Sequence, residues 1–366
     1  MPSPPPRPSP LQSRHQALGA RLAPFAGWQM PLQYAGVVEE HHAVRHAVGV
    51  FDVSHLGKVL VQGTGAADLV DATLTNSLSR IGPGRGQYTL CCTEEGGIVD
   101  DLLVYQRSAE ELLLVPNAAN AASVAARLAA AAPAGVTVVD RHSDFAVLAV
   151  QGPRSTELLT RLDLPADQPY LHFTDTRWGN VPVTVCRSGY TGERGFELIL
   201  PNEGAGPLWD ALLAAGAPLG VRPAGLAVRD VLRIEMGYPL HGADLTVEVT
   251  PVQARLGWAV GWDKPAFWGR EGLLAERARG PRRLLRGLRV VDRAIPRGGM
   301  AVHDETDGEV GRVTSGTFSP ALGAGIGLAL LASEVPVGAP VWLDVRGRRA
   351  AATVVDPPFV PARPQG

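Results

Sequence analysis

Lysine, cysteine, aromatic side chains and net charge are all scarce in this sequence. Only Lys58 and Lys264 are lysines among 34 basic residues, and the formal net charge is −2 at pH 7. A chain so close to neutral has no overall field that would attract nucleic acid or an anionic membrane, so we expect neither as a partner. The three cysteines are too few for a disulfide framework, which favours a reducing compartment.

Long apolar runs are missing as well. No run of about 18 apolar residues, the length that spans a membrane, occurs in the chain. The opening MPSPPPRPSP lacks the apolar segment that a signal peptide requires. These absences predict a soluble, cytoplasmic protein.

What the sequence does have is 45% apolar residues, together with 42 glycines and 31 prolines. This composition supports more than one hydrophobic core and excludes a mainly disordered chain. Residues 1–8, rich in proline and serine, are the exception, and we predict a disordered tail there.

Helical and strand patterns are mixed between residues 9 and 275, which predicts an α+β region of two interleaved subdomains with antiparallel sheets. Gly96 and Gly97 predict a hairpin between two of its strands. Helices are predicted over 37–48, 66–75, 118–132 and 225–237, with one more opened by Pro153. Strands are predicted over 57–63, 87–93, 98–106, 111–117, 145–152, 181–190 and 195–201.

The pattern changes near residue 275. The polar stretch AERARGPRR is followed by short apolar strands separated by turn residues. Strands at this spacing favour a small β-barrel or sandwich over residues 282–366. We therefore place the main domain boundary here.

Two polar clusters favour ordinary structural roles. His42 and His46 stand four apart on a predicted helix, but the zincin pattern requires a glutamate at position 43, which is alanine. We predict a solvated helix face and no metal site. The glycines of GPGRGQ lack the Lys-Ser/Thr pair of a phosphate loop, so a turn is favoured.

Arginines gather around the domain boundary. Such a run is most often a solvated face, and the alternative is a docking surface for an acidic partner. The arginines stand at positions 277, 279, 282, 283, 286, 289, 293 and 297.

Two segments bring carboxylates to strand ends. GGIVDDLLVY places Asp100 and Asp101 just after a turn, and because neighbours on a strand point to opposite faces, at most one can face a given cavity. SGYTGERGFEL places Tyr190 and Glu197 on two strands joined by a glycine-containing turn, so both could reach one ligand. A plain turn and a hairpin with a core tyrosine are the structural alternatives.

A third segment, GLAVRDVLRIEMG, predicts a helix in which Arg229, Asp230, Arg233 and Glu235 alternate with apolar residues. Ion pairs four residues apart are the structural alternative to a binding role.

Together these segments resemble one family, the T protein of the glycine cleavage system, a tetrahydrofolate-dependent aminomethyltransferase. The resemblance runs in order from about Pro10 to Val360, and nine collinear matches make it specific. The matching stretches are PFAGWQMPLQY, EEHHAVRHAVGVFDVSHLG, QYTLCCTEEGGIVDDLLVY, PNAAN, LAVQGP, SGYTGERGFEL, PAGLAVRDVLRIEMG, VTSGTFSP and PPFVP.

The resemblance implies a folate-binding region over residues 9–275, followed by a C-terminal β-barrel. It implies that the enzyme takes an aminomethyl group from the dihydrolipoyl arm of the small, acidic H protein. Its carbon passes to tetrahydrofolate, giving 5,10-methylenetetrahydrofolate, ammonia and dihydrolipoyl H protein. Tetrahydrofolate is then the one-carbon acceptor, and no metal is implied.

The resemblance also assigns roles to residues. Asp101 corresponds to the catalytic aspartate, Glu197 to the carboxylate that binds the pterin, and Arg229 to the guanidinium at the glutamate end of folate. A free aspartate has a pKa of about 3.9, so we expect Asp101 to be ionised at pH 7 unless it is deeply desolvated. An anion there would stabilise a cationic iminium. Further folate contacts are expected from Tyr88, Tyr190 and Asn117.

Some positions depart from the family pattern. His241 stands where a tyrosine near the folate is common, and Gln253 where a carboxylate is common. A tyrosine that helps the folate tail in some members is absent, which leaves Arg363 as the charged candidate. For the acidic H protein we expect the boundary arginines to form the docking surface, chiefly Arg282, Arg283 and Arg286.

Two other functions remain open from the sequence. The same fold could use another one-carbon donor, as in a methylamine or sulfonium demethylase. It could also bind folate without turnover, although the retained Asp101 argues against this.

Overall fold

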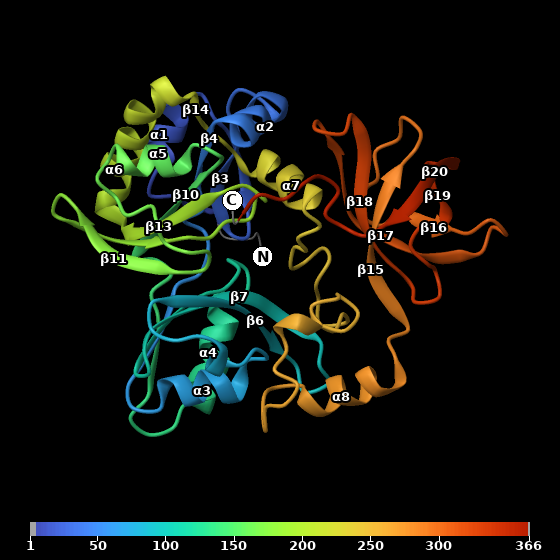
Figure 1. The fold of residues 1–366 in the computed structure, drawn as a ribbon, viewed down its shortest axis with the longest axis horizontal. Coiled ribbons are helices and arrows are strands. Elements are labelled where there is room, and N and C mark those ends of the chain that lie inside the picture. Colours follow the sequence, from blue (N-terminus) through green and yellow to red (C-terminus); the bar gives the residue numbers. More distant parts are fainter. Residues whose placement is uncertain (1–4, 365–366) are drawn as a thin grey trace.

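The computed structural model describes residues 5–364, and these form three parts arranged around a common centre (Figure 1). Two parts each contain a large sheet with helices, and the third is a closed β-barrel. The fold class predicted from the sequence, α+β with antiparallel sheets and a C-terminal barrel, is confirmed. No helix in the described range is long and apolar enough to cross a membrane.

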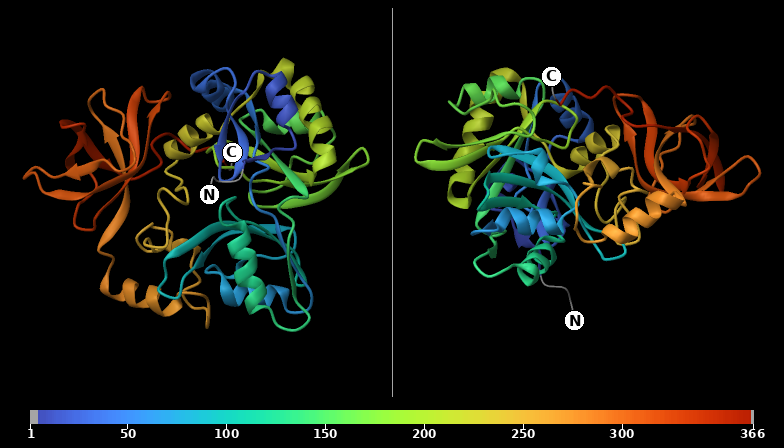
Figure 2. Two further views of the ribbon diagram at one scale, coloured as in Figure 1. Left: turned by 180° about the vertical axis from the view of Figure 1, so that it is seen from behind. Right: turned by 60° about the horizontal axis from the view of Figure 1, so that its bottom comes forward.

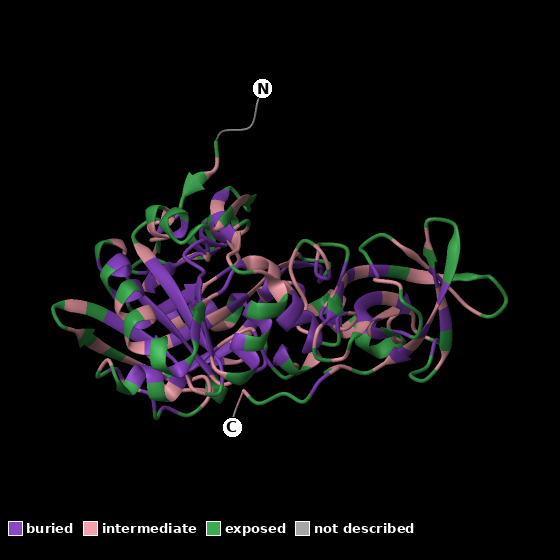
Figure 3. Cartoon of the chain, turned by 90° about the horizontal axis from the view of Figure 1, so that it is seen from above, coloured by how far each residue is buried: buried purple, intermediate pink, exposed green. Residues whose placement is uncertain are grey.

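The first part is built on a six-stranded sheet in the order β11-β12-β13-β10-β4-β14. Its central strands are almost completely buried (Figure 3). Helices α5 (Ser155–Thr160) and α6 (Asn202–Gly216) cover one face, and α2 (Val37–His46) and α7 (Leu226–Glu235) pack on the other. The strands are β4 (Val48–Asp52), β10 (Phe145–Gln151), β11 (Phe173–Trp178), β12 (Val181–Cys186), β13 (Gly195–Pro201) and β14 (Val221–Pro223).

A small three-stranded sheet and helix α1 (Gln12–Ala17) complete this part. Its strands are β1 (Arg7–Pro8), β2 (Arg21–Phe25) and β3 (Trp28–Gln33). Residues 1–4 of the predicted disordered tail lie outside the described residues. For residues 7 and 8 the prediction of disorder is wrong, because they pair in parallel with Trp28 and Gln29.

The second part is a five-stranded sheet in the order β6-β7-β8-β5-β9. Helices α3 (Ala66–Thr73) and α4 (Ala121–Ala131) cover one face. The predicted hairpin between β6 and β7 is present, with Gly96 at a φ of 93°. The strands are β5 (Val59–Gln62), β6 (Arg85–Cys92), β7 (Ile98–Ser108), β8 (Glu111–Val115) and β9 (Thr137–Asp140).

The face of the six-stranded sheet that packs on α2 and α7 also shares a core with the face of the five-stranded sheet opposite α3 and α4. Tyr105 of β7 and Leu113 of β8 belong to one apolar cluster with Val147 of β10 and Ile199 of β13. Side chains on a strand alternate between faces with a period of two residues. Asp101, four residues before Tyr105, and Glu197, two before Ile199, therefore lie on the two facing surfaces.

The third part is a closed barrel in the order β15-β18-β17-β16-β19-β20. Closure leaves no open strand edge. Figure 2 shows the barrel standing beside the other two parts. The strands are β15 (Arg283–Val290), β16 (Ala301–His303), β17 (Glu309–Ser319), β18 (Ala324–Ala332), β19 (Pro340–Val345) and β20 (Arg348–Val355).

A long connection leads from α7 to the barrel and contains helix α8 (Arg270–Arg279). The boundary that the sequence placed near residue 275 therefore falls inside this helix, and the barrel starts at Arg283. Leu245, Leu256 and Phe267 of the connection pack on the β6–β7 hairpin. A smaller difference concerns α5, which begins two residues after Pro153.

Buried polar groups join α7 to the barrel. Arg233 donates to Asp244 over 2.6 Å and to the Ser315 hydroxyl of β17 over 2.8 Å. Two residues further on, Glu235 accepts hydrogen bonds from Ser319 of β17 and from His41 of α2. Helix α7, which carries Arg229, is thus fixed from both sides.

Candidate active site

Asp100 and Asp101 lie near the start of β7, and a single asparagine holds both. The Asn117 side-chain amide donates to Asp100 Oδ1 over 3.0 Å and to Asp101 Oδ1 over 2.9 Å. The Asn117 backbone N–H also donates to Asp100, over 3.0 Å. Asp101 faces the other large sheet, while Asp100 faces the loop that leads into α4. This arrangement agrees with the expectation that at most one of the two carboxylates faces a given cavity, although the Asn117 amide reaches both.

Tyr88 completes the surroundings of Asp101. It is a diagonal neighbour of Asp101 on the same face of the hairpin, because Tyr88 pairs with Leu103. Its hydroxyl donates to Asp101 Oδ2 over 3.0 Å, and its ring stacks on Trp258, whose side chain is 62% exposed. Burial, aided by the charge of Asp101, raises the pKa of Tyr88 well above its ordinary value, so the hydroxyl keeps its proton.

Burial also raises the pKa of both aspartates. For Asp100, desolvation is reinforced by the adjacent Asp101 charge. For Asp101, desolvation outweighs the hydrogen bond from Tyr88 and the influence of His241. The sequence analysis expected Asp101 to be ionised unless it is deeply desolvated, and the structure shows that desolvation. A cationic group placed beside the pair would favour its ionised form.

Glu197 is held by a relay that starts on β7. Tyr105 lies 3.0 Å from the Ser188 hydroxyl, which donates to Glu197 Oε2 over 2.6 Å. The Ser188 hydroxyl therefore accepts from Tyr105. Oε1 of Glu197 has no hydrogen-bond partner among residues 5–364. One acceptor of a buried carboxylate is thus left for a ligand.

Arg229 and Tyr190 lie next to Glu197. The Arg229 guanidinium stands 4.9 Å from the centre of the Tyr190 ring, and burial lowers its pKa, with Glu197 opposing. Its buried Nη1 has no hydrogen-bond partner within the described chain. The Tyr190 hydroxyl donates to the Pro239 carbonyl. A buried cation with an unsatisfied donor fits an anionic ligand group.

These observations show which predicted residues come together. Asp101, Tyr88 and Asn117 form one hydrogen-bonded group on the five-stranded sheet. Glu197, Arg229 and Tyr190 form a second group on the first part of the fold. Electrostatic coupling links the groups, because the Asp101 charge contributes to the raised pKa of Tyr190, which is due mainly to burial. Together they offer acceptors, aromatic rings and one cation to a single polar ligand.

Asn120, Ser188 and Tyr105 were not predicted as site residues, and His241 was expected near the folate but not beside the aspartates. His241 lies 2.9 Å from Asn120, which donates to Asp100 over 2.7 Å. Ser188 and Tyr105 hold Glu197. The motif PNAAN could have revealed Asn120, since it repeats asparagine three residues after the predicted Asn117. No local pattern connects position 241 to that pair, because they meet only in the folded chain.

The departures from the family pattern fall in different places. Gln253 contacts neither Asp101 nor Glu197. Its side-chain amide donates to Glu276 of α8 over 2.8 Å and accepts from Arg283 of β15 over 2.8 Å. Arg363 lies beside the turn that follows Tyr190, where its N–H donates to the Gly192 carbonyl. Phe359 donates in the same way to the Glu235 carbonyl. The C-terminal segment therefore returns from the barrel to the site.

The predicted docking arginines differ in whether their side chains already have hydrogen-bond or ion-pair partners. Arg283 donates to Gln253 and to the Glu248 carbonyl, and Arg286 pairs with Asp356 at 3.2 Å. Arg282 is exposed and has no side-chain partner among residues 5–364. Of these three residues, Arg282 presents the free positive charge.

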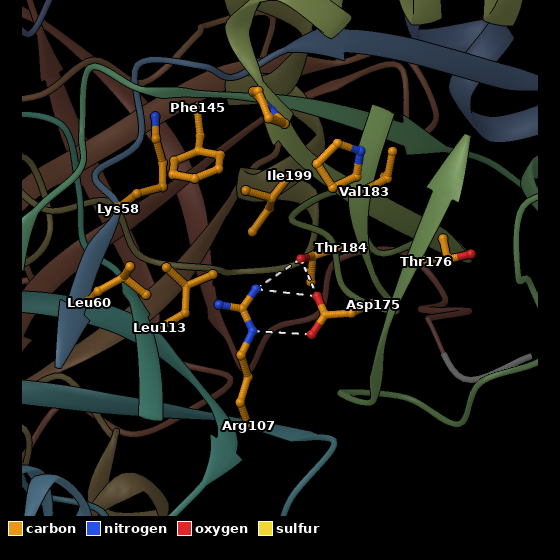
Figure 4. A pocket seen from close by; sticks show the side chains of 12 residues that line it. Lys58, Leu60, Arg107, Leu113, Phe145, Asp175, Thr176, Val183, Thr184 and Ile199 are labelled. Carbon is orange, nitrogen blue, oxygen red and sulfur yellow. Dashed lines mark hydrogen bonds and ion pairs between the residues drawn. The ribbon is translucent and has the colours of Figure 1, made fainter. Parts of the chain in front are cut away.

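Other candidate centres lie apart from this site. The three cysteines are buried and unpaired. No cluster of three metal-ligating side chains occurs in the described part of the chain. A cavity of about 220 Å³ opens at another place between the two sheets, lined by Leu113, Ile199 and the Arg107–Asp175 pair (Figure 4). None of the predicted site residues lines it, so the hydrogen-bonded carboxylates are the stronger evidence for the site.

Comparisons with known proteins extend over nearly the whole chain. The family description "GCVT N-terminal domain" matches residues 11–264, and "Glycine cleavage T-protein C-terminal barrel domain" matches residues 283–361. A protein named aminomethyltransferase from Parafrankia sp. (strain EAN1pec) is 61% identical over 361 residues, which is 98% of this chain and 99% of the relative. One from Mycobacterium tuberculosis (strain ATCC 25618 / H37Rv) is 58% identical over 355 residues, 96% of each chain.

A solved structure agrees with these matches. The crystal structure of glycine cleavage system aminomethyltransferase T from Bartonella henselae is 34% identical and has a TM-score of 0.92. The similarity covers 98% of this chain and 99% of that one.

Proposed function

Because the chain belongs to the glycine cleavage T-protein family, we propose that it moves the one-carbon unit of an aminomethyl group from the lipoyl arm of H protein to tetrahydrofolate. The class is a tetrahydrofolate-dependent aminomethyltransferase, as identities of 54% to 61% over nearly the full length indicate. The proposed products are 5,10-methylenetetrahydrofolate, ammonia and dihydrolipoyl H protein.

The observation that supports this proposal best is the Asp101 group. The carboxylate is desolvated, fixed by Asn117 and Tyr88, and faces the surface that carries Glu197. Such a fixed anion stabilises positive charge that develops nearby, because it needs no reorganisation during the reaction. Transfer of the aminomethyl carbon through an iminium would place such a positive charge next to Asp101.

The proposed step balances in atoms and charge. The bonds from the carbon to the amine nitrogen and to the lipoyl sulfur break, and two bonds to folate nitrogens form. The two protons released by the folate nitrogens leave with ammonia and with the thiol. Asp101 has the position to accept and pass on one of these protons.

The second group supplies the folate contacts. The two carboxylate oxygens of Glu197, the free Oε1 and the Oε2 that Ser188 holds, can accept hydrogen bonds from the 2-amino group and the ring N–H of a pterin. The unsatisfied Nη1 of Arg229 suits a carboxylate of the folate glutamate. The rings of Tyr88 and Tyr190 offer apolar faces to the pterin and aminobenzoyl rings.

A direct assay tests the proposal. Purified enzyme receives tetrahydrofolate and aminomethylated lipoyl H protein, and ammonia and methylenetetrahydrofolate are measured. D101A should lower turnover by about 10²-fold or more while tetrahydrofolate still binds. The matched control is D167N, at an exposed aspartate outside the site, which should behave like the wild type.

Two outcomes would contradict the proposal. Turnover with another methyl donor, but none with H protein, would indicate a demethylase. Folate binding without any product would indicate a binding module. Turnover of D101A within a few-fold of the wild type would remove the role given to this residue.

A further inference from the structure

His241 lies in the segment after α7 and contacts two other elements. Its Nε2 is 3.2 Å from the Ile98 carbonyl of β7, and its Nδ1 is 2.9 Å from the Asn120 side-chain amide nitrogen. A carbonyl oxygen only accepts, and an amide nitrogen only donates. The ring must therefore carry its proton on Nε2 and accept at Nδ1, which defines one neutral tautomer.

Asn120 is used here in an unusual way. It occupies the N-cap position of α4, where asparagine commonly caps the helix, yet its side chain makes no capping hydrogen bond. Its amide instead joins His241 Nδ1 to Asp100 Oδ1, over 2.9 Å and 2.7 Å. The helix therefore lacks a stabilising side-chain cap, and the Asn120 amide makes this link instead.

The segment that carries His241 is fixed at several points. Asp244 accepts from Arg233, from the Leu240 backbone over 2.9 Å and from Ser315 of the barrel over 2.9 Å. The Tyr190 hydroxyl donates to the Pro239 carbonyl just before it. His241 therefore presents a rigidly held acceptor to Asn120.

We propose that His241 is a positioning residue for Asp101, acting through Asn120 and Asp100 and only as the neutral imidazole. Asn120 and Asn117 both donate to Asp100 Oδ1, and Asn117 also donates to Asp101 Oδ1. The orientation of Asp101 thus depends on a network whose last acceptor is His241 Nδ1. For its activity readout, this inference rests on the proposed function.

Protonation of the His241 ring would turn Nδ1 from an acceptor into a donor and so break its hydrogen bond with Asn120. An imidazolium has N–H donors on both nitrogens, so Nδ1 would meet the donor of Asn120. The Asn120 amide would then turn its oxygen to the ring and lose its hydrogen bond to Asp100. The titratable groups that face His241 are the Asp100 and Asp101 carboxylates of β7. Other charged or titratable groups nearby are Tyr88 on β6, Tyr190, and the Asp244–Arg233 pair.

Two substitutions and a control test the proposal. H241N keeps an acceptor close to the Nδ1 position but cannot become charged, and H241F removes the acceptor. H42N makes the same chemical change at an exposed histidine of α2. Turnover and the KM for tetrahydrofolate are measured from about pH 5 to pH 8, the interval in which histidine changes its charge.

At the alkaline end we expect H241F to lower kcat by about ten-fold, the effect of one lost hydrogen bond, with little change in KM. H241N should stay within about three-fold of the wild type there. Towards acid pH every variant should lose turnover as the buried aspartates take up protons, but the loss should be smaller in H241N than in the wild type and H42N. Nitrogen NMR of the ring in the wild type should show the Nε2–H tautomer.

The proposal is overturned if H241F has the turnover and pH profile of the wild type, or if the ring carries its proton on Nδ1. It is also overturned if the acid loss of turnover is as large in H241N as in the wild type. A wild type without aminomethyl transfer would refute the proposed function instead. In that case the NMR measurement still decides the His241 geometry.

Discussion

Asp244 and Asp230 both pair with Arg233, and their different burial makes a sharp test of what fixes α7. Arg233 is 3% exposed in its side chain, Asp244 is fully buried and Asp230 is 48% exposed. The distances are similar, 2.6 Å to Asp244 and 2.8 Å to Asp230. Burial would lower the pKa of Arg233, but Asp244 more than compensates and holds it above the ordinary value.

The two carboxylates should therefore contribute very different free energies. D244N leaves a buried guanidinium without its main counter-charge, which should lower the free energy of unfolding by about 3 kcal/mol. D230N removes a partly exposed pair, and we expect a loss of less than about 1 kcal/mol. Because α7 also carries Arg229, D244N should raise the KM for tetrahydrofolate, whereas D230N should not.

Urea denaturation followed by circular dichroism compares the midpoints of both variants with that of the wild type. The double variant R233M/D244N should recover part of the lost stability, because it removes the unpaired charge. Equal midpoint shifts for D244N and D230N would refute the argument that burial sets the strength of these pairs.

Three further predictions follow from individual contacts. Y88F removes the hydrogen bond to Asp101 and should lower kcat by about ten-fold with little effect on the KM for folate; an unchanged kcat would show that Asp101 needs no such support. R282E reverses the exposed charge at the start of the barrel and should raise the KM for H protein, while R161E, just after the end of α5, should not; equal KM values for the two variants would exclude Arg282 from the docking surface. Burial opposes ionisation of Glu235, but His41, Ser319 and Arg45 prevail and lower its pKa to about 2. Because this folded pKa lies below the ordinary value of about 4.3, the ionised Glu235 stabilises the fold fully above about pH 4.3, and this stabilisation disappears as the pH falls towards 2. Urea midpoints measured across this range should therefore depend less on pH in E235Q than in the wild type.

Most of the secondary structure was predictable because its signals are local. The β6–β7 hairpin follows from Gly96 and Gly97, and α7 from its apolar spacing. Strand β16 was missed because three residues carry no usable period. Helix α8 was taken for a polar break, since its charged residues hide the few apolar ones that pack, such as Leu273.

The site was predictable only in part. Asp101, Glu197 and Arg229 stand in recognisable motifs, and the structure places them on surfaces that face each other. Ser188 and Asn120 were not predicted, and His241 was expected near the folate without its link to the aspartates, because these hydrogen bonds join distant elements. The raised pKa of Asp101 depends on burial by both large sheets, which no local pattern encodes. Cytoplasmic location stays a prediction.

The return of the C-terminal segment has a consequence for the order in which the molecule is completed. Phe359, Arg363 and Pro364 bind the end of α7, the Gly192 turn and Arg187, respectively. Chains are synthesised from the N-terminus, and domains fold as they emerge from the ribosome. The two large sheets can therefore form while the barrel is still being made, but the turn beside Tyr190 receives these partners only after the barrel has been synthesised. A nascent or clipped chain that lacks these few residues would hold every predicted site residue and still leave the site open on one side.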